Sequence, residues 1–113
     1  MRDDAIRDLF AGLGPVTIKP MFGGKGIYHQ GLIVALEVDG EVLLKADPQS
    51  VPDFENARCS QWVYHGHKGR GPTAMPYWSI PDAALDDPDE LAVWTKRAYE
   101  AALRSKSPKR TTT

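Results

Sequence analysis

The sequence predicts an α+β domain in which an antiparallel sheet of about five strands carries one helix from each end of the chain. Two hairpin signals in the middle of the chain and a helical apolar pattern at each end support this fold class. The 113 residues are 42% hydrophobic and 26% charged, which is typical of one ordinary globular domain. No apolar run could span a membrane and no signal peptide opens the chain, so we expect a cytoplasmic protein.

The first predicted element is a helix over residues 4–13, whose apolar residues recur at helical spacing: Ile6, Leu9, Phe10 and Leu13. Asp3 or Asp4 can cap its start. Residues 16–22 are then β-branched and extended. Pro20 within them indicates an edge strand or a bulge, because proline cannot donate to a β-ladder.

A three-stranded antiparallel meander is predicted next, over residues 24–29, 32–38 and 41–46. Asp39 and Gly40 separate the last two strands. This pair is a strong hairpin signal, because both residues tolerate the positive φ of a type I′ turn. A turn that ends at Gly31 joins the first two strands.

Residues 47–57 are expected to form a short helical or irregular crossing with Asp47 as its cap. Residues 60–65 and 73–80 are again strand-like. A glycine-rich basic loop separates them, so we expect a second hairpin.

The C-terminal helix has the clearest start. Asp87 suits the N-cap, Pro88 the first helical position and Glu90 the third, as in a capping box. Trp94 belongs to its apolar face, and the helix should end near Arg104.

Residues 104–113 carry four basic side chains and no acidic or apolar one, so we expect a basic disordered tail after a single domain of residues 1–103. The net charge of the whole chain is −1, which leaves −5 on the domain itself. An acidic domain is a poor general binder of nucleic acid, because that affinity comes mainly from neutralising phosphates.

The glycine-rich segment Met21–Gly31 invites comparison with a phosphate-binding loop. Such a loop needs a Lys-Ser/Thr pair and a helix directly after it, whereas strand-forming residues follow here. We therefore expect Gly23, Gly24 and Gly26 to bend the chain or to admit a close neighbour in the sheet, with Met21 and Phe22 entering the core.

His65 and His67 are two residues apart, as a pair of metal ligands on one strand would be. Cys59, His29 or Asp82 could supply a third ligand, but no recognised spacing joins them, so polar residues at a hairpin tip are the better interpretation. Cys59 could also be a nucleophile with a histidine as its base, although a lone cysteine is more often a small buried side chain. We expect no cofactor and no enzymatic activity, and a small metal- or Cys/His-dependent enzyme is the less favoured alternative.

Lys68 and Arg70 lie in the basic loop 65–71, where they could contact a partner or simply form a solvated hairpin tip. Three aromatic residues stand on the strands that flank this loop: Trp62, Tyr77 and Trp78. If exposed, they could stack on bases or anchor a protein. Burial in the core is the favoured alternative, because aromatic side chains supply the largest buried area per residue.

Taken together, residues 6–102 resemble the N-terminal domain of the TfoX/Sxy family. The motifs that carry the resemblance are Met21-Phe22-Gly23-Gly24, Gly26-Ile27-Tyr28, Leu44-Lys45-Ala46-Asp47, Tyr77-Trp78, Ile80-Pro81 and the segment from Asp87-Pro88 to Trp94. The resemblance implies an antiparallel sheet flanked by helices, with no cofactor and no known enzymatic activity. Full-length relatives are bacterial regulators of competence genes that act with the cyclic-AMP receptor protein and carry a second, helical domain.

We therefore expect a stand-alone N-terminal domain that acts as a non-enzymatic regulatory module and binds a protein partner, with the transcription machinery as one candidate. Direct nucleic-acid binding through loop 65–71 and the basic tail is the alternative. A homodimer could form through exposed strand edges near Pro20 or Pro76.

Overall fold

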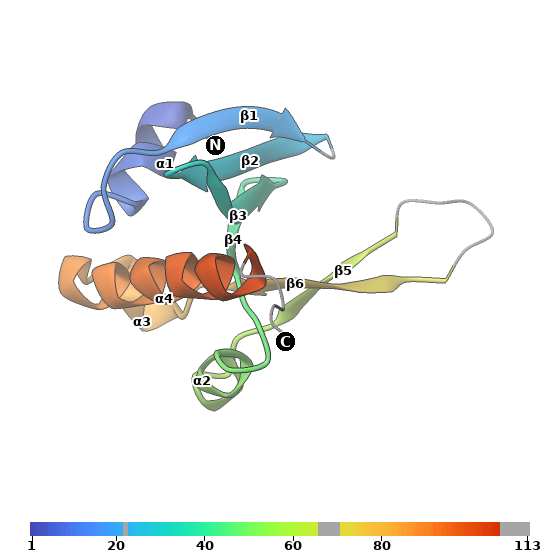
Figure 1. Ribbon diagram of the computed structural model, residues 1–113. Helices are drawn as coiled ribbons and strands as arrows, with labels where there is room; N and C mark the ends of the chain where they lie inside the picture. Colours follow the sequence, from blue (N-terminus) through green and yellow to red (C-terminus); the bar gives the residue numbers. More distant parts are fainter. Residues whose placement is uncertain (22, 66–70, 107–113) are drawn as a thin grey trace.

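The computed structural model describes residues 1–21, 23–65 and 71–106. Within them, one six-stranded antiparallel sheet has the strand order β1-β2-β3-β4-β6-β5 (Figure 1). Its strands are β1 (Thr17–Met21), β2 (Gly24–His29), β3 (Leu32–Val38), β4 (Glu41–Lys45), β5 (Gln61–Tyr64) and β6 (Thr73–Ser79). The helices are α1 (Asp3–Leu9), α2 (Val51–Asn56), α3 (Asp82–Leu85) and α4 (Pro88–Lys106). The predicted α+β class is confirmed, with β1 as an additional full strand.

Two tight turns set the register of the central strands. Asp39 (φ 51°) and Gly40 (φ 84°) both have positive φ, as a type I′ turn requires, so the predicted hairpin of β3 and β4 is confirmed. Gln30 (φ 53°) and Gly31 (φ 80°) connect β2 to β3 in the same way. Such short turns determine the register, and the register decides which side chains share a face of the sheet.

Strands β1 and β5 form the two edges of the sheet. Pro20 lies on β1, in agreement with the predicted edge position. Pro76 lies on β6, between β4 and β5, so the expectation of an exposed edge near Pro76 is wrong. The pairing of β5 with β6 confirms the second hairpin, whose loop residues 66–70 lie outside the described residues.

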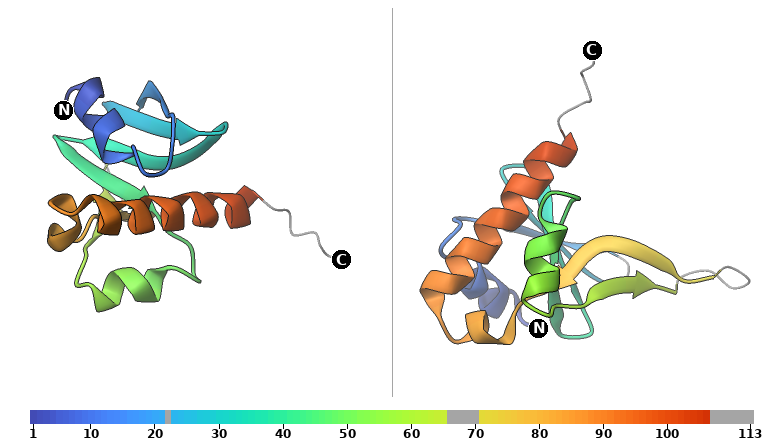
Figure 2. Two further views of the ribbon diagram at one scale, coloured as in Figure 1. Left: turned by 90° about the vertical axis from the view of Figure 1, so that its left-hand side faces the viewer. Right: turned by 90° about the horizontal axis from the view of Figure 1, so that it is seen from below.

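The helices cover one face of this sheet (Figures 1 and 2). Side chains from every helix join one buried cluster with strand residues of that face: Ile6 of α1, Phe54 of α2, Ala84 of α3, Leu91, Trp94 and Ala98 of α4, and Ile27, Ala35, Leu44 and Trp78 of the strands. The longest helix, α4, packs against β3 and β4 in the middle of the sheet. This cluster is the main core of the domain.

The first helix is shorter than predicted. It ends at Leu9 rather than at Leu13, and tight turns lead from there to Gly14. Within these turns Gly12 packs so closely on Ala92 of α4 that a Cβ atom at residue 12 would collide with it. The absence of a side chain at Gly12 therefore lets these turns pack directly on α4, beyond the end of the helix.

Helices α1 and α4 differ in how their first turns are capped. The residue before α1 is Arg2, and no side chain caps that helix, so the predicted cap by Asp3 or Asp4 is wrong. Both aspartates lie in the first turn, where their negative charge interacts favourably with the positive end of the helix dipole. The predicted cap of α4 is confirmed, because Asp87 Oδ1 accepts hydrogen bonds from two backbone N–H groups of the first turn at 3.0 and 3.3 Å.

Asp47 caps the first turn of the crossing segment, as predicted, although α2 itself begins only at Val51, after Ser50. The side chains of Asp47 and Ser50 each accept a hydrogen bond from the other residue's backbone N–H, both at 3.0 Å. Arg104 Nε and Nη2 donate to the two carboxylate oxygens of Asp47 at 2.6 and 3.0 Å. This pair ties the end of α4 to the loop after β4.

The end of α4 lies beyond the predicted boundary. The helix continues through Lys106, so a tail can begin no earlier than residue 107, and residues 107–113 lie outside the described residues. Arg104 and Lys106 lie in the last helical turn, where their positive charge interacts favourably with the negative end of the helix dipole. No helix in the described part of the chain has the length and apolarity needed to cross a membrane.

Candidate interaction surface

The second face of the sheet carries an apolar cluster built from strand residues alone. Leu36, Leu43 and Tyr77 are buried at its centre, and half-buried apolar side chains pack around them. We call this surface the helix-free face; its members are Lys19, Met21, Tyr28, Ile33, Leu36, Val38, Leu43, Lys45, Trp62, Met75 and Tyr77. None of the described helices contributes to it, and in Figure 1 the β1–β2 pair and the β5–β6 hairpin extend to the right, past the helices.

Strand pairing places these side chains on one side of the sheet. Leu36 lies opposite Leu43, and Lys45 lies opposite Tyr77. Directly opposite residues of antiparallel strands point to the same face. Their chain neighbours, such as Leu44, point to the helices and are fully buried there.

The glycine-rich segment shapes one edge of the helix-free face. Met21 pairs with Gly24, so Gly23 belongs to a tight turn, and the bulge expected at Gly23 and Gly24 lies instead between Ile27 and Tyr28 of β2. A Cβ atom at Gly24 would collide with the backbone carbonyl of Glu37, which confirms the expected close approach.

Gly26 has a different neighbourhood, made of side chains. A Cβ atom there would lie 3.1 Å from the ring of Tyr28 and 3.2 Å from Sδ of Met21, so both side chains lean over this glycine. Met21 thus belongs to the helix-free face rather than to the main core, and Phe22 lies outside the described residues. Close backbone approach at Gly24 and side-chain packing at Gly26 thus account for these two glycines.

Two lysines of this face lie over aromatic rings. Lys19 Nζ is 5.1 Å from the ring centroid of Tyr28, and Lys45 Nζ is 5.3 Å from that of Tyr77. Such contacts stabilise an ammonium group through the negative face of the ring. Partial burial lowers the pKa of Lys45, an effect that the negative charge of Asp47 opposes.

The predicted aromatic contact residues divide between the two faces. Trp62 and Tyr77 meet on the helix-free face, where Trp62 is half-buried and Tyr77 is only 6% exposed. Trp78 lies in the main core, with its ring centroid 6.0 Å from that of Phe54, so it is not available to a partner. The alternative of burial in the core beneath the helices is therefore confirmed for Trp78, whereas Tyr77 is buried on the opposite face. Lys68 and Arg70 lie outside the described residues.

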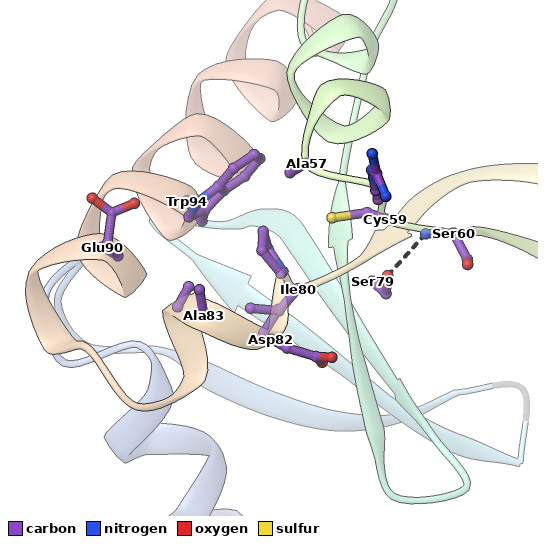
Figure 3. Close-up of a pocket in the computed structure, with 12 residues that line it drawn as sticks. Ala57, Cys59, Ser60, Ser79, Ile80, Asp82, Ala83, Glu90 and Trp94 are labelled. Atoms are coloured by element: carbon purple, nitrogen blue, oxygen red, sulfur yellow. Dashed lines mark hydrogen bonds between the residues drawn. The ribbon is translucent and has the colours of Figure 1, made fainter.

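The candidate nucleophile Cys59 lines a cleft of about 620 Å³ between the end of α2, α3 and α4. Figure 3 shows Cys59 and Trp94 facing this cleft from two sides, with Ser79 and Asp82 beside it. Burial raises the pKa of the Cys59 thiol and the charge of Asp82 adds to this, although a hydrogen bond with Ser79 opposes it. A raised pKa keeps the thiol protonated at neutral pH, which is the opposite of what a nucleophilic cysteine needs.

The predicted histidine candidates do not converge. His29 is buried, and its Nδ1 lies 2.7 Å from the carbonyl oxygen of Pro15, so this side chain has a structural contact. His65 is exposed beyond β5, and His67 lies outside the described residues. Among residues 1–21, 23–65 and 71–106, no three His, Cys, Asp or Glu side chains come together as metal ligands would.

Several members of the helix-free face escaped the sequence prediction. Met75, Lys19 and Lys45 follow the period-two alternation of a strand, which marks them as pointing to one side. Ile33 does not, because the register irregularity between β2 and β3 places Ile33 and Leu36, three residues apart, on the same face. The alternation cannot tell which side the helices cover, because the choice depends on contacts between distant segments.

Comparison with known proteins bears directly on the family. The family model for the TfoX N-terminal domain matches residues 8–102, which is most of the 113-residue chain. A comparison with curated proteins found no match. The matched range contains every strand and the helices α2 and α3, and it runs into the last turns of α4. The chain therefore belongs to the family of TfoX N-terminal domains.

Proposed function

We propose that this domain is a non-enzymatic interaction module that docks a protein partner on its helix-free face. One observation carries the proposal: an apolar cluster of strand residues remains partly exposed, and no described helix covers it. Contiguous apolar surface of this kind is more often an interaction site than chance exposure, because burying it against a partner is favourable.

A regulatory role, with the transcription machinery as a candidate partner, is the extension that family membership suggests. The raised pKa of the Cys59 thiol supports a non-enzymatic role, because it disfavours the thiolate that nucleophilic catalysis would use. Trp62 and Met75 are half-buried apolar side chains of the kind that frequently anchor partners.

Direct nucleic-acid binding is less well supported on this surface. Stacking on bases needs open ring faces, whereas Lys19 and Lys45 lie over the rings of Tyr28 and Tyr77. The contribution predicted for loop 65–71 and for the basic tail stays a prediction, because residues 66–70 and 107–113 lie outside the described residues.

A photo-crosslinking experiment tests the proposed function. The photoreactive residue p-benzoylphenylalanine replaces Met75 on the helix-free face or, as a matched control, Val93, which is 42% exposed on α4. In cells that express the protein, we expect covalent protein adducts at residue 75 and far fewer at residue 93. The captured protein, once purified, should bind the wild-type domain and the Val93→Glu variant but bind Met75→Glu about tenfold more weakly. Equal capture at both positions would contradict the proposal.

A further inference from the structure

The charges of the helix-free face differ from those of the rest of the domain. Elsewhere, partly buried cations lie within 4.0 Å of a carboxylate: Lys25 with Asp3, Arg97 with Asp53, Arg104 with Asp47, and the N-terminal amine with Glu37. Lys45, which is also partly buried, and Lys19, which is exposed, have no carboxylate within that distance among the residues that the structure describes, and each lies over a tyrosine ring. The helix-free face therefore has a net positive character inside an acidic domain.

The nearest acidic side chain on the same strand cannot neutralise Lys45. Glu41 shares the face of Lys45 by strand alternation, but it is exposed at the other end of β4, beside the Asp39–Gly40 turn. Four residues of a strand span about 13 Å, which is beyond the reach of an ion pair. Asp47 raises the pKa of Lys45 through its charge, but both of its carboxylate oxygens are engaged by Arg104.

Partial burial makes Lys45 receptive to a new anion. Its ammonium group has lost part of its hydration, as the lowered pKa reflects, and a ring face compensates only in part. A carboxylate delivered by a partner would pair with a cation whose desolvation is already partly complete, so it would gain more there than at a fully exposed lysine.

We propose that the partner presents an acidic segment to the helix-free face, with carboxylates on Lys19 and Lys45 and apolar side chains on Met21, Ile33 and Met75. This inference rests on the proposed docking function and specifies its ligand. A second copy of the domain fits less well, because facing copies would bring four lysines together. Phosphates could also meet the lysines, but the half-buried apolar side chains of this face would stay unmatched.

Selection from a random-peptide phage library tests the inference. The baits are the wild-type domain, the double variant Lys19→Glu/Lys45→Glu, and the control double variant Arg7→Glu/Lys96→Glu, whose side chains are exposed on α1 and α4. We expect wild type and control to enrich peptides rich in Asp, Glu and aliphatic residues. The Lys19→Glu/Lys45→Glu bait should instead enrich Lys and Arg, and it should bind the selected acidic peptides about tenfold more weakly. Thermal unfolding of each bait confirms that it is folded.

The outcomes separate this inference from the proposed function. Peptides that lose binding with Met75→Glu but show no acidic enrichment would overturn the acidic ligand and leave docking intact. Peptides indifferent to Met75→Glu, or no enrichment at all, would overturn both. Tighter binding of a single-stranded oligonucleotide than of any peptide, abolished by Lys19→Glu/Lys45→Glu, would overturn the inference in favour of nucleic acid. A dimer in light scattering that Met75→Glu dissociates would overturn it in favour of a second copy.

Discussion

The two faces of the sheet are built from alternate residues of the same strands, yet they end in different states. On the helix-covered face, Ile27, Ala35 and Leu44 are fully buried under the helices. On the helix-free face, Leu36 and Leu43 are nearly as buried, but the apolar side chains that surround them are only half-buried. The covered face holds the fold together, and the other face keeps apolar surface and two lysines for a partner.

The largest expected difference between the faces is in stability. Phe54→Ala removes a fully buried ring whose centroid lies 4.9 Å from that of Trp94, so we expect a loss of about 3–5 kcal/mol in the free energy of unfolding. Met75→Ala on the helix-free face should cost only about 1 kcal/mol, because its side chain is already partly hydrated. Urea unfolding followed by circular dichroism measures both. Equal losses would show that the helix-free face is an ordinary part of the core.

A second comparison uses two glycines of strand β2. Gly24→Ala places a methyl group against the backbone carbonyl of Glu37, which cannot move without breaking the sheet, so we expect a loss of about 2–3 kcal/mol. Gly26→Ala meets the side chains of Tyr28 and Met21, which can shift, and should cost about 1 kcal/mol. The same unfolding assay measures both changes. A larger loss for Gly26→Ala would show that the helix-free face is rigidly packed.

The ion pair between Arg104 of α4 and Asp47 of the β4–α2 loop should make the stability of the domain depend on pH. The hydrogen bonds from Arg104 hold the pKa of Asp47 below its ordinary value of 3.8. The stabilisation is therefore complete above that value and is lost as the pH falls through the lower pKa of the folded state. We expect Asp47→Asn to cost about 1–2 kcal/mol at neutral pH and its difference from wild type to shrink below about pH 4. A difference that stays constant down to pH 2–3, roughly, would contradict this account.

The smallest expected effect is that of Lys45→Met. The substitution removes an ammonium group with a lowered pKa and keeps a chain of similar length over Tyr77, so stability should change by no more than about 0.5 kcal/mol. Binding of an acidic peptide should nevertheless weaken and lose part of its salt dependence. Isothermal titration at two salt concentrations measures this. A large loss of stability would mean that Lys45 serves the fold rather than a ligand.

Local chemistry accounts for what the sequence predicts well. Asp39 and Gly40 can form the type I′ turn wherever they occur between strands, and Asp87 caps α4 through the backbone of the next turn. The first helix is predicted too long because its apolar spacing continues past Leu9 into turns, where Gly12 packs on Ala92, 80 residues away in the chain. The cap by Asp47 is local and therefore predictable, whereas its ion pair with Arg104, which is 57 residues away, is not.

The candidate interaction surface is likewise only partly predictable from local sequence patterns. Alternation along the strands marks Met21 as sharing a side with Lys19 and Met75 as sharing a side with Tyr77, but only the assembled fold shows that no described helix lies over them. Trp62 and Trp78 look alike in the sequence, and they separate because β5 and β6 place them on opposite faces. Whether an apolar strand residue becomes core or contact surface is therefore decided by tertiary packing.

The most direct test of the central claim is to watch methyl groups on both faces while a partner binds. In NMR spectra of methyl-labelled protein, addition of the partner identified by crosslinking, or of a selected acidic peptide, should shift or broaden the methyl signals of Met21, Ile33 and Met75. The methyl signals of Ile27 and Leu44, buried under the helices, should stay in place. Changes confined to exposed helix residues such as Val93 and Leu103, with the helix-free face unaffected, would contradict the account.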